Sequence, residues 1–225
     1  MATDIGRGVT VRWWGQACMS VTAPDGTCVV VDPFPADFGY KPPTVEAQVC
    51  LVTHEHRDHN AVDALRGDPV VLRGPGRHQA AGLEFLGIAT YHDDQQGAKR
   101  GPNTVFVWTM GGMRLAHLGD LGHPLTAQQR EQVGPVDVLM IPVGGFYTLE
   151  PAEAVEVAKA LATKVVLPMH YKTPALERLP IATAEDFLGL IPAEWKVERP
   201  DACVLNLRED DLPAGGTRVV LLAYE

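Results

Sequence analysis

The sequence predicts an α/β fold in which two β-sheets pack face to face with helices on their outer sides. Two turn signals, Pro24-Asp25-Gly26 and Gly111-Gly112, separate pairs of strand-like segments and indicate β-hairpins. Wholly apolar runs such as 49–52 are typical of strands that are buried on both faces. Helix-like segments such as 151–161 alternate with these runs, and a two-sheet core with outer helices would bury the apolar residues of both.

The first half of the chain is expected to be rich in strands. The expected strands span residues 9–14, 19–23, 27–31, 49–52, 70–72 and 88–91. Residues 36–44, which are rich in proline and aromatic residues, are expected to form a loop. Helices are expected at 60–65, ended by Gly67, and at 78–85.

The second half repeats this order of elements with a different sequence. Strands are expected at residues 104–109, 114–118, 138–141, 165–167 and 218–223. Helices are expected at 127–133, 151–161 and 184–190, and Pro151 stands in a first turn, where its missing N–H is harmless. No linker or low-complexity segment divides the chain, so residues 1–225 are expected to form one domain.

Composition indicates a globular protein that binds neither nucleic acid nor a membrane. The formal net charge is −9 and the longest basic cluster is Lys99-Arg100, so no extended surface for phosphate backbones is expected. No apolar run approaches the ~20 residues that span a bilayer, and no leader pattern opens the chain. The expected location is the cytoplasm, and the expected partner is a small-molecule substrate.

A dense cluster of metal-ligand residues follows the strand expected at 49–52. It is the run His54-Glu55-His56-Arg57-Asp58-His59. Alternate residues of an extended segment point the same way, so His54 and His56 can face one ion together. Asp58 and His59 follow within one turn and can face a second ion. Neutral imidazole and carboxylate are ligands of zinc and neighbouring metals, so the run predicts a metal site.

Three further candidate ligands stand at the ends of other expected strands, namely His92, Asp120 and His170. Strand ends at one edge of a sandwich lie near each other, so loops there can build a shared site. Each oxygen of a carboxylate can bind one cation, which suits Asp120 as a bridge between two ions. The residues alone leave His78 and His117 open as alternatives to His92.

The signature His54-x-His56-x-Asp58-His59 resembles that of the metallo-β-lactamase superfamily. The later segments Gly119-Asp120, Pro142-Val143-Gly144-Gly145 and Pro168-Met169-His170-Tyr171 look like the branch of metal-dependent hydrolases that includes L-ascorbate-6-phosphate lactonase. The resemblance runs from about residue 11 to residue 171. It implies a four-layer αββα sandwich with two metals at the edge between the sheets.

The resemblance also implies how the ligands are shared. The first metal would be held by His54, His56 and His92, and the second by Asp58, His59 and His170, with Asp120 between them. The family's third histidine often stands in a Thr-Pro-Gly-His-like turn, whereas here Asp93 directly follows His92 and could compete as a ligand. Leu121 follows the bridging position, where the family often has threonine.

The expected site would hold two divalent cations, which are zinc or else manganese or iron. A site of this kind predicts a metal-dependent hydrolase. At a separation of about 3.5–4 Å the two cations would bind one water between them and lower its pKa from ~15.7 toward ~7. The resulting hydroxide would attack an ester, lactone, amide or phosphoester bond of a small metabolite. Asp58 could accept a hydrogen bond from the hydroxide and later shuttle a proton.

Three residues near the ligands are candidates for substrate binding. Lys172 and Arg100 could each hold an anionic group, and Tyr147 could line the pocket. The remaining polar residues have structural interpretations. His117 is expected to be structural or to support the ligands, His123 and His78 to be on the surface, and Glu55 and Arg57 to point away from the metals.

Three other functions remain open from the sequence. A metal-binding or regulatory protein could have an occupied but non-catalytic site. The resemblance also allows a diiron oxidoreductase, although that class usually has glutamate at the position of His56. It allows a nuclease as well, which the acidic charge disfavours. A homo-oligomer is compatible with the sequence.

Overall fold

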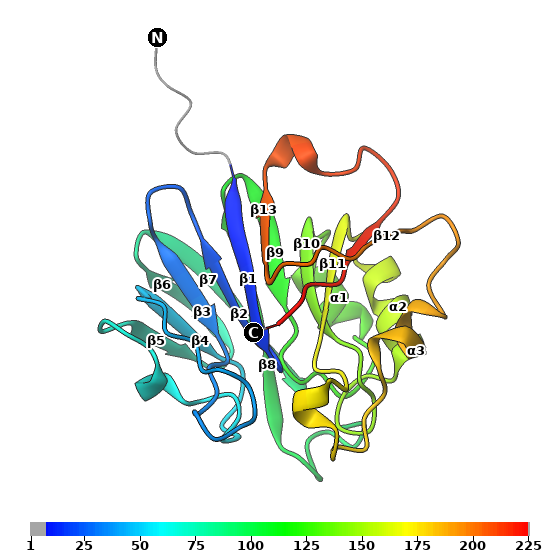
Figure 1. Cartoon of the computed structure of the whole chain (residues 1–225), viewed down its shortest axis with the longest axis horizontal. Helices are drawn as coiled ribbons and strands as arrows, with labels where there is room; N and C mark the ends of the chain where they lie inside the picture. The colour runs from blue at the N-terminus through cyan, green and yellow to red at the C-terminus, as the bar shows by residue number, and fades with distance from the viewer. Residues whose placement is uncertain (1–7, 225) are drawn as a thin grey trace.

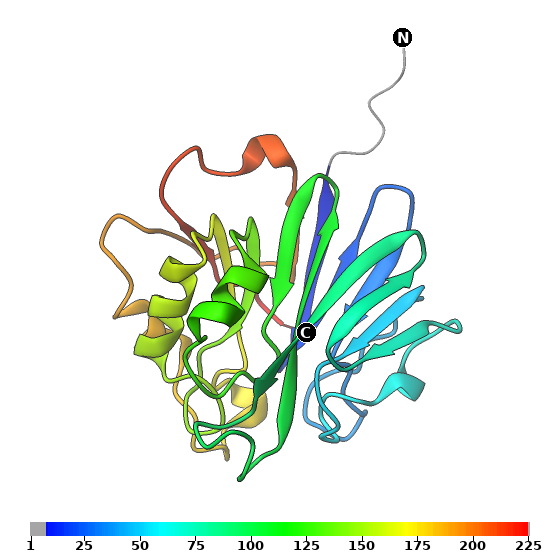
Figure 2. The same cartoon turned by 180° about the vertical axis from the view of Figure 1, so that it is seen from behind.

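The computed structural model describes residues 8–224, in which two β-sheets pack against each other and α-helices lie on one flank (Figure 1; Figure 2). The predicted α/β fold with two large sheets is therefore confirmed. The ends of the expected 1–225 domain, residues 1–7 and 225, lie outside the described range. None of the helices within that range has the length and apolar character needed to cross a membrane.

The sheets have six and eight strands. In order across the six-stranded sheet these are β13 (Val204–Leu207), β1 (Val9–Gly15), β2 (Cys18–Thr22), β3 (Cys28–Val31), β4 (Val49–Val52) and β5 (Val70–Arg73). In order across the eight-stranded sheet they are β12 (Lys196–Glu198), β14 (Arg218–Val220), β11 (Val165–Met169), β10 (Val138–Pro142), β9 (Met113–His117), β8 (Pro102–Met110), β7 (Leu83–Tyr91) and β6 (Gly76–Ala80).

The main hydrophobic core lies between the two sheets. Side chains of a strand alternate between its faces, so Trp13 of β1 points into this core while Trp14 packs in a second cluster on the outer face. Leu115 of β9 and Val138 of β10 enter the core from the other sheet. Each large apolar side chain buried in this way contributes about 1.5–3 kcal/mol to stability.

The two outer layers differ. Three helices, α1 (Ala127–Val133), α2 (Pro151–Ala160) and α3 (Ala184–Leu188), lie on the side of the eight-stranded sheet (Figure 1). The outer face of the six-stranded sheet is covered by the segment 33–48, whose Phe34, Tyr40 and Ala47 pack in the second cluster. The helix expected at 60–65 is a single 3-10 turn, Val62–Ala64. Loops therefore replace α-helices in this layer.

Strand direction brings the loops that carry the predicted ligands to one edge. β3, β4 and β5 are parallel neighbours, as are β9, β10 and β11. β7 has the direction of β9, because both strands are antiparallel to β8. The segments that follow β4, β7, β9 and β11 contain all of the ligands expected from the sequence.

Most expected elements are present, but the helix expected at 78–85 is wrong. This segment belongs to the β6–β7 hairpin, in which Ala80 pairs with Leu83. The two residues of the turn, Ala81 and Gly82, have φ values of 48° and 72°. A two-residue hairpin loop favours such positive φ values because they match the twist of the strands. Alanine rarely adopts this conformation, so the turn gave only a weak sequence signal. Strands β12 and β13 were not expected.

Replacing Ala81 by asparagine should stabilise the protein by about 0.5–1 kcal/mol, because asparagine adopts the left-handed conformation at a lower cost than alanine. The midpoint of equilibrium unfolding in urea should rise. Gly82→Ala serves as the opposite control, since it adds a β-carbon at φ 72° and should lower the midpoint. A lower midpoint for Ala81→Asn would contradict the conformation of this turn.

Candidate metal centre

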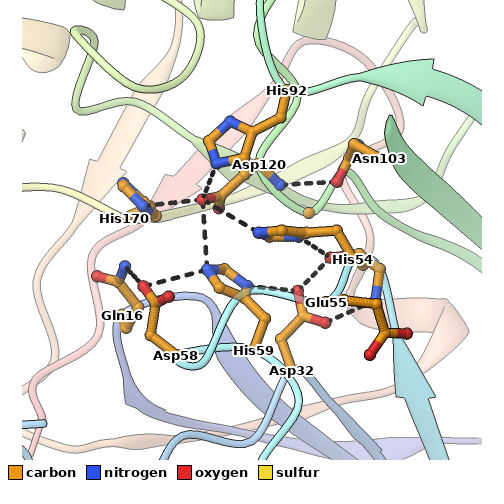
Figure 3. Close-up of polar contacts among 12 residues, drawn as sticks. Gln16, Asp32, His54, Glu55, Asp58, His59, His92, Asn103, Asp120 and His170 are labelled. Atoms are coloured by element: carbon orange, nitrogen blue, oxygen red, sulfur yellow. Dashed lines mark hydrogen bonds and ion pairs between the residues drawn. The ribbon is translucent and has the colours of Figure 1, made fainter. Parts of the chain in front are cut away.

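The seven predicted ligands lie together at one edge of the sandwich. Figure 3 shows the side chains of His54, His59, His92 and His170 directed at Asp120 from different segments of the chain. His56 lies against His54 and His92, with ring centroids 4.7 and 5.0 Å away. Asp58 lies on the other side of the cluster, where its carboxylate is 3.4 Å from Nε2 of His59.

Asp120 occupies the centre of the cluster. Its side chain is buried, and Nε2 atoms of four histidines approach its Oδ2: His92 at 3.1 Å, His170 at 3.2 Å, His59 at 3.3 Å and His54 at 3.9 Å. Burial raises the pKa of Asp120, but the charges of His170 and His59 lower it well below its usual value. The residue is therefore an anion enclosed by imidazoles.

The predicted ligand atoms other than those of Asp120 fall into two groups of three, and Asp120 Oδ2 approaches histidines of both. One comprises His54, His56 and His92, and the other comprises Asp58, His59 and His170; within each group the atoms lie within 4.8 Å of one another. Buried Nε2 atoms of His54 and His59, and Oδ1 of Asp120, have no hydrogen-bond partner. Unpaired buried polar atoms are costly, and a cation would satisfy them. The donor set fits zinc, manganese or iron.

The protonation of the histidines agrees with this fit. Burial lowers the pKa of His54 to about 3, and the charge of His59 adds to the effect, so the ring is neutral near pH 7 and offers a lone pair. Burial also lowers the pKa of His170, but the charge of Asp120 outweighs it and raises that pKa. A proton and a cation would therefore compete for the same nitrogen.

Asp32 supports the cluster from behind and was not identified from the sequence. Its Oδ2 accepts hydrogen bonds from His59 Nδ1 at 3.0 Å and from the Thr53 hydroxyl at 2.7 Å. Since that hydroxyl donates to Asp32, it accepts from His54 Nδ1 at 2.9 Å. His54 thus carries its proton on Nδ1 and turns the Nε2 lone pair toward Asp120, while Asp32 holds the His59 ring through its Nδ1 proton. A carboxylate behind a histidine is the usual support of a metal ligand.

Three residues around the cluster have a strained backbone. Gln16, Asp32 and His170 follow β1, β3 and β11 and have φ values of 50°, 52° and 51°. Such conformations cost about 1–3 kcal/mol each and gather at functional sites, where the surrounding structure holds them. Gln16 also donates from Nε2 to Asp58 Oδ2 at 3.0 Å, while its main-chain oxygen accepts from His170 N–H at 3.0 Å.

Asp93 is turned away from the cluster. Its carboxylate accepts hydrogen bonds from the backbone N–H groups of Gln95, Gly97, Lys99 and Arg100 at 2.7–2.9 Å. Burial raises the pKa of Asp93, but these bonds, that of Arg100 foremost, lower it to about 2. Its oxygens organise the loop, which favours His92 over Asp93 as the ligand.

The other histidines lie outside the cluster. His117 is buried, and because Gly119 N–H donates to its Nδ1, its Nε2 donates to Ala17 O at 2.8 Å. His78, in β6, donates from Nε2 to the main-chain oxygen of Gly74, and Nε2 of His123 accepts from Tyr91 N–H. Glu55 and Arg57 point away and pair with other charged residues, Arg73 and Asp37 respectively (Figure 3 for Glu55).

A cavity of about 290 Å³ opens onto the cluster. Five of the seven predicted ligands line it, together with apolar Phe38 and Leu179. Arg100 and Tyr147 also line it, as expected for substrate contacts, whereas Lys172 does not. A larger hollow of about 770 Å³ over β6, β7 and β8 contains none of the predicted ligands.

Residues 10–170 match the family model described as a Beta-lactamase superfamily domain. The chain is 37% identical to a Thermotoga maritima protein proposed to be a Zn-dependent hydrolase of the metallo-β-lactamase superfamily, with a TM-score of 0.79 over 95% of this chain and 98% of that one. It is 28% identical over 217 residues to a metal-dependent hydrolase of Archaeoglobus fulgidus, covering 82% of this chain and 91% of the relative. A metal-dependent hydrolase of Thermoplasma acidophilum is 30% identical over 192 residues, or 72% of this chain and 83% of the relative.

Gly119→Ala should destabilise the protein more than Gly26→Ala, by about 1–3 kcal/mol, because the new β-carbon crowds the site. A β-carbon at Gly119 would lie 2.4 Å from Asn103 Oδ1, the atom that accepts from Asp120 N–H, and 2.7 Å from Thr53. Gly26 has a similarly left-handed φ of 90° but nothing within 4 Å, so it controls for backbone strain. Equal losses in urea unfolding would contradict this close packing.

Proposed function

The chain belongs to the metallo-β-lactamase superfamily, and from that premise we propose that it is a hydrolase whose reaction depends on two divalent cations. Its relatives in Archaeoglobus fulgidus and Thermoplasma acidophilum are named metal-dependent hydrolases. The observation that carries the proposal is the pair of three-residue ligand groups whose histidines approach one buried carboxylate, Asp120.

Each group of ligands would hold one cation. His54, His56 and His92 would bind the first, Asp58, His59 and His170 the second, and Asp120 would lie between them. Such a pair of cations supplies an activated water and polarises the bond to be broken. Zinc suits the donor set, with manganese and iron as alternatives. The nuclease and oxidoreductase alternatives have no separate support in the site.

Asp58 is the residue best placed to handle the proton. Burial raises its pKa, but the positive charge of His59 outweighs burial and lowers the pKa, so Asp58 is ionised. Its side chain is 26% exposed, whereas that of Asp120 is 3% exposed, so Asp58 is the carboxylate of the centre that a substrate can reach. The Gln16 amide holds its Oδ2 in place, at 3.0 Å.

The substrate of the proposed reaction is a small molecule. A cavity of about 290 Å³ lies at the lower end of the range for ligand sites, and the cations would take part of it. We propose an ester, lactone, amide or phosphoester as the bond cleaved. The resemblance to the branch containing L-ascorbate-6-phosphate lactonase makes lactones and phosphoesters the first compounds to screen.

Elemental analysis of protein purified without added metal should give about two divalent ions per chain, because two ligand groups share Asp120. Asp120→Ala should carry fewer ions and lose at least about 100-fold in hydrolysis of any substrate found in the screen. His78→Ala removes a histidine outside the centre and should keep the full metal content.

Four outcomes would contradict the proposal. One is the absence of bound metal even after incubation with zinc and with manganese. Another is full activity of both Asp120→Ala and His56→Ala. Mainly iron, with redox activity and no hydrolysis, would favour an oxidoreductase, and full metal occupancy without hydrolysis of any compound would favour a regulatory protein.

Asp32→Asn should weaken zinc affinity by about 10- to 100-fold, because the anion that orients His59 and Thr53 is lost. Titration with zinc against a competing chelator measures the change. Asp25→Asn, which removes an exposed carboxylate from the β2–β3 turn, is the matched control and should leave the affinity unchanged. Equal affinities for both variants, with both folded by circular dichroism, would show that Asp32 does not support the metal centre.

A further inference from the structure

One cation in the cavity has no place in the proposed metal centre. Among the described residues that line the cavity, Arg100 is the only lysine or arginine. The acidic residues of the lining, Asp58 and Asp120, face the histidines and would be balanced by the metals. The positive charge of Arg100 is therefore available to bind an anionic group of a molecule that enters the cavity.

The backbone of Arg100 is fixed relative to the metal centre. Its N–H donates to Asp93 Oδ2 at 2.7 Å, the shortest of the bonds that close the loop. At the base of the loop, His92 N–H donates to Gly101 O at 3.1 Å. A predicted ligand and Arg100 are therefore tied to the two ends of one hydrogen-bonded turn, so the spacing between them is set before any substrate binds.

The side chain of Arg100 is placed by two aromatic rings. Its guanidinium carbon lies 5.2 Å from the ring centroid of Tyr147 and 6.0 Å from that of Phe146. Arginine stacks on such rings and keeps its N–H edges free for a planar anion. Phe146 is 55% exposed and has a φ of 55°, so an apolar ring is held at the surface in a strained conformation. Strain of this kind gathers where ligands bind.

Arg100 also lacks a carboxylate partner. Within residues 8–224 its guanidinium forms no ion pair, while its neighbour Lys99 pairs with Asp94 at 3.4 Å. Three exposed arginines are paired, Arg57 with Asp37, Arg73 with Glu55 and Arg199 with Glu185, whereas Arg66, Arg77 and Arg178 form no ion pair within the described residues. Arg100 differs from these unpaired arginines because it lines the cavity that opens onto the predicted ligands.

We propose that the guanidinium of Arg100 binds a carboxylate or phosphate group of the substrate, so that the substrates are small organic anions. This inference rests on the proposed hydrolase function. The bond to be cleaved lies at the predicted ligands that line the cavity, Asp58 among them, and the anionic group lies against Arg100 and Tyr147 of the same lining. Apolar Phe38 and Leu179 contact the part of the molecule in between.

The test compares two esters with the same leaving group, neutral para-nitrophenyl butyrate and anionic mono-para-nitrophenyl glutarate, on zinc-loaded protein. The ratio of their kcat/KM values, anionic over neutral, should fall by about 10- to 100-fold in Arg100→Gln, because a charge-assisted hydrogen-bonded pair is lost. Arg100→Lys should give an intermediate ratio, since lysine keeps the positive charge but lacks the planar guanidinium that donates two parallel hydrogen bonds. Lys99→Gln makes the same change in net charge one residue away and should keep the wild-type ratio.

A binding measurement makes the test independent of turnover. Calorimetric titration with glutarate and with glycerol phosphate should show affinities about 10- to 100-fold weaker in Arg100→Gln than in Lys99→Gln. The anion with the larger difference identifies carboxylate or phosphate as the group recognised.

The outcomes distinguish a failure of the Arg100 inference from a failure of the proposed hydrolase function. If the wild type hydrolyses the esters but Arg100→Gln keeps both the ratio and the affinities, the inference about Arg100 is overturned and the hydrolase function stands. If the wild type hydrolyses neither ester, the hydrolase function fails for these bonds, and calorimetry alone decides whether Arg100 binds an anion.

Discussion

The burial of Asp120 is the constraint on which the site depends. A carboxylate enclosed at this depth has to be balanced by hydrogen-bonding or charged partners, because an unpaired buried anion is strongly destabilising. The partners are four imidazole nitrogens from segments that follow β4, β7 and β11. Those segments meet only because strands of both sheets end at the same edge. The strand directions bring these segments to one edge, and the absence of a β-carbon at Gly119 leaves room for Asn103 and Thr53 to pack beside Asp120.

The second buried carboxylate, Asp32, shows that the supporting structure is as specific as the ligands. It joins two rings through one oxygen, directly to His59 and by way of Thr53 to His54. Its own backbone is strained, as are those of Gln16 and His170 at neighbouring strand ends. The flanking strands are buried and hydrogen-bonded on both sides, so they can hold these conformations. Rigid sheets thus keep strained, charged loops in place.

Local patterns in the sequence predicted the two-sheet fold and the ligand run from His54 to His59, because spacing along an extended segment is a local property. Longer-range features were harder to predict. Asp32 contacts residues 21 and 27 positions away, and a single aspartate after a strand is too common to stand out. The side chain of Asp93 turns to backbone N–H groups of its own loop, which residue type alone does not indicate. The β6–β7 turn was missed because Ala81 is atypical for it.

The loop between β7 and β8 is closed on itself. Its inner hydrogen bonds end on Asp93, and its two ends are joined between His92 and Gly101. Because these bonds use backbone N–H groups, the side chains of residues 94–100 can change in charge and aromatic content while His92 stays in register with Asp120. The side chains of this loop can therefore be exchanged without moving the residues of the metal centre. New specificities could then arise in descendants of this chain by replacing one hairpin tip, without rebuilding the residues that perform the chemistry.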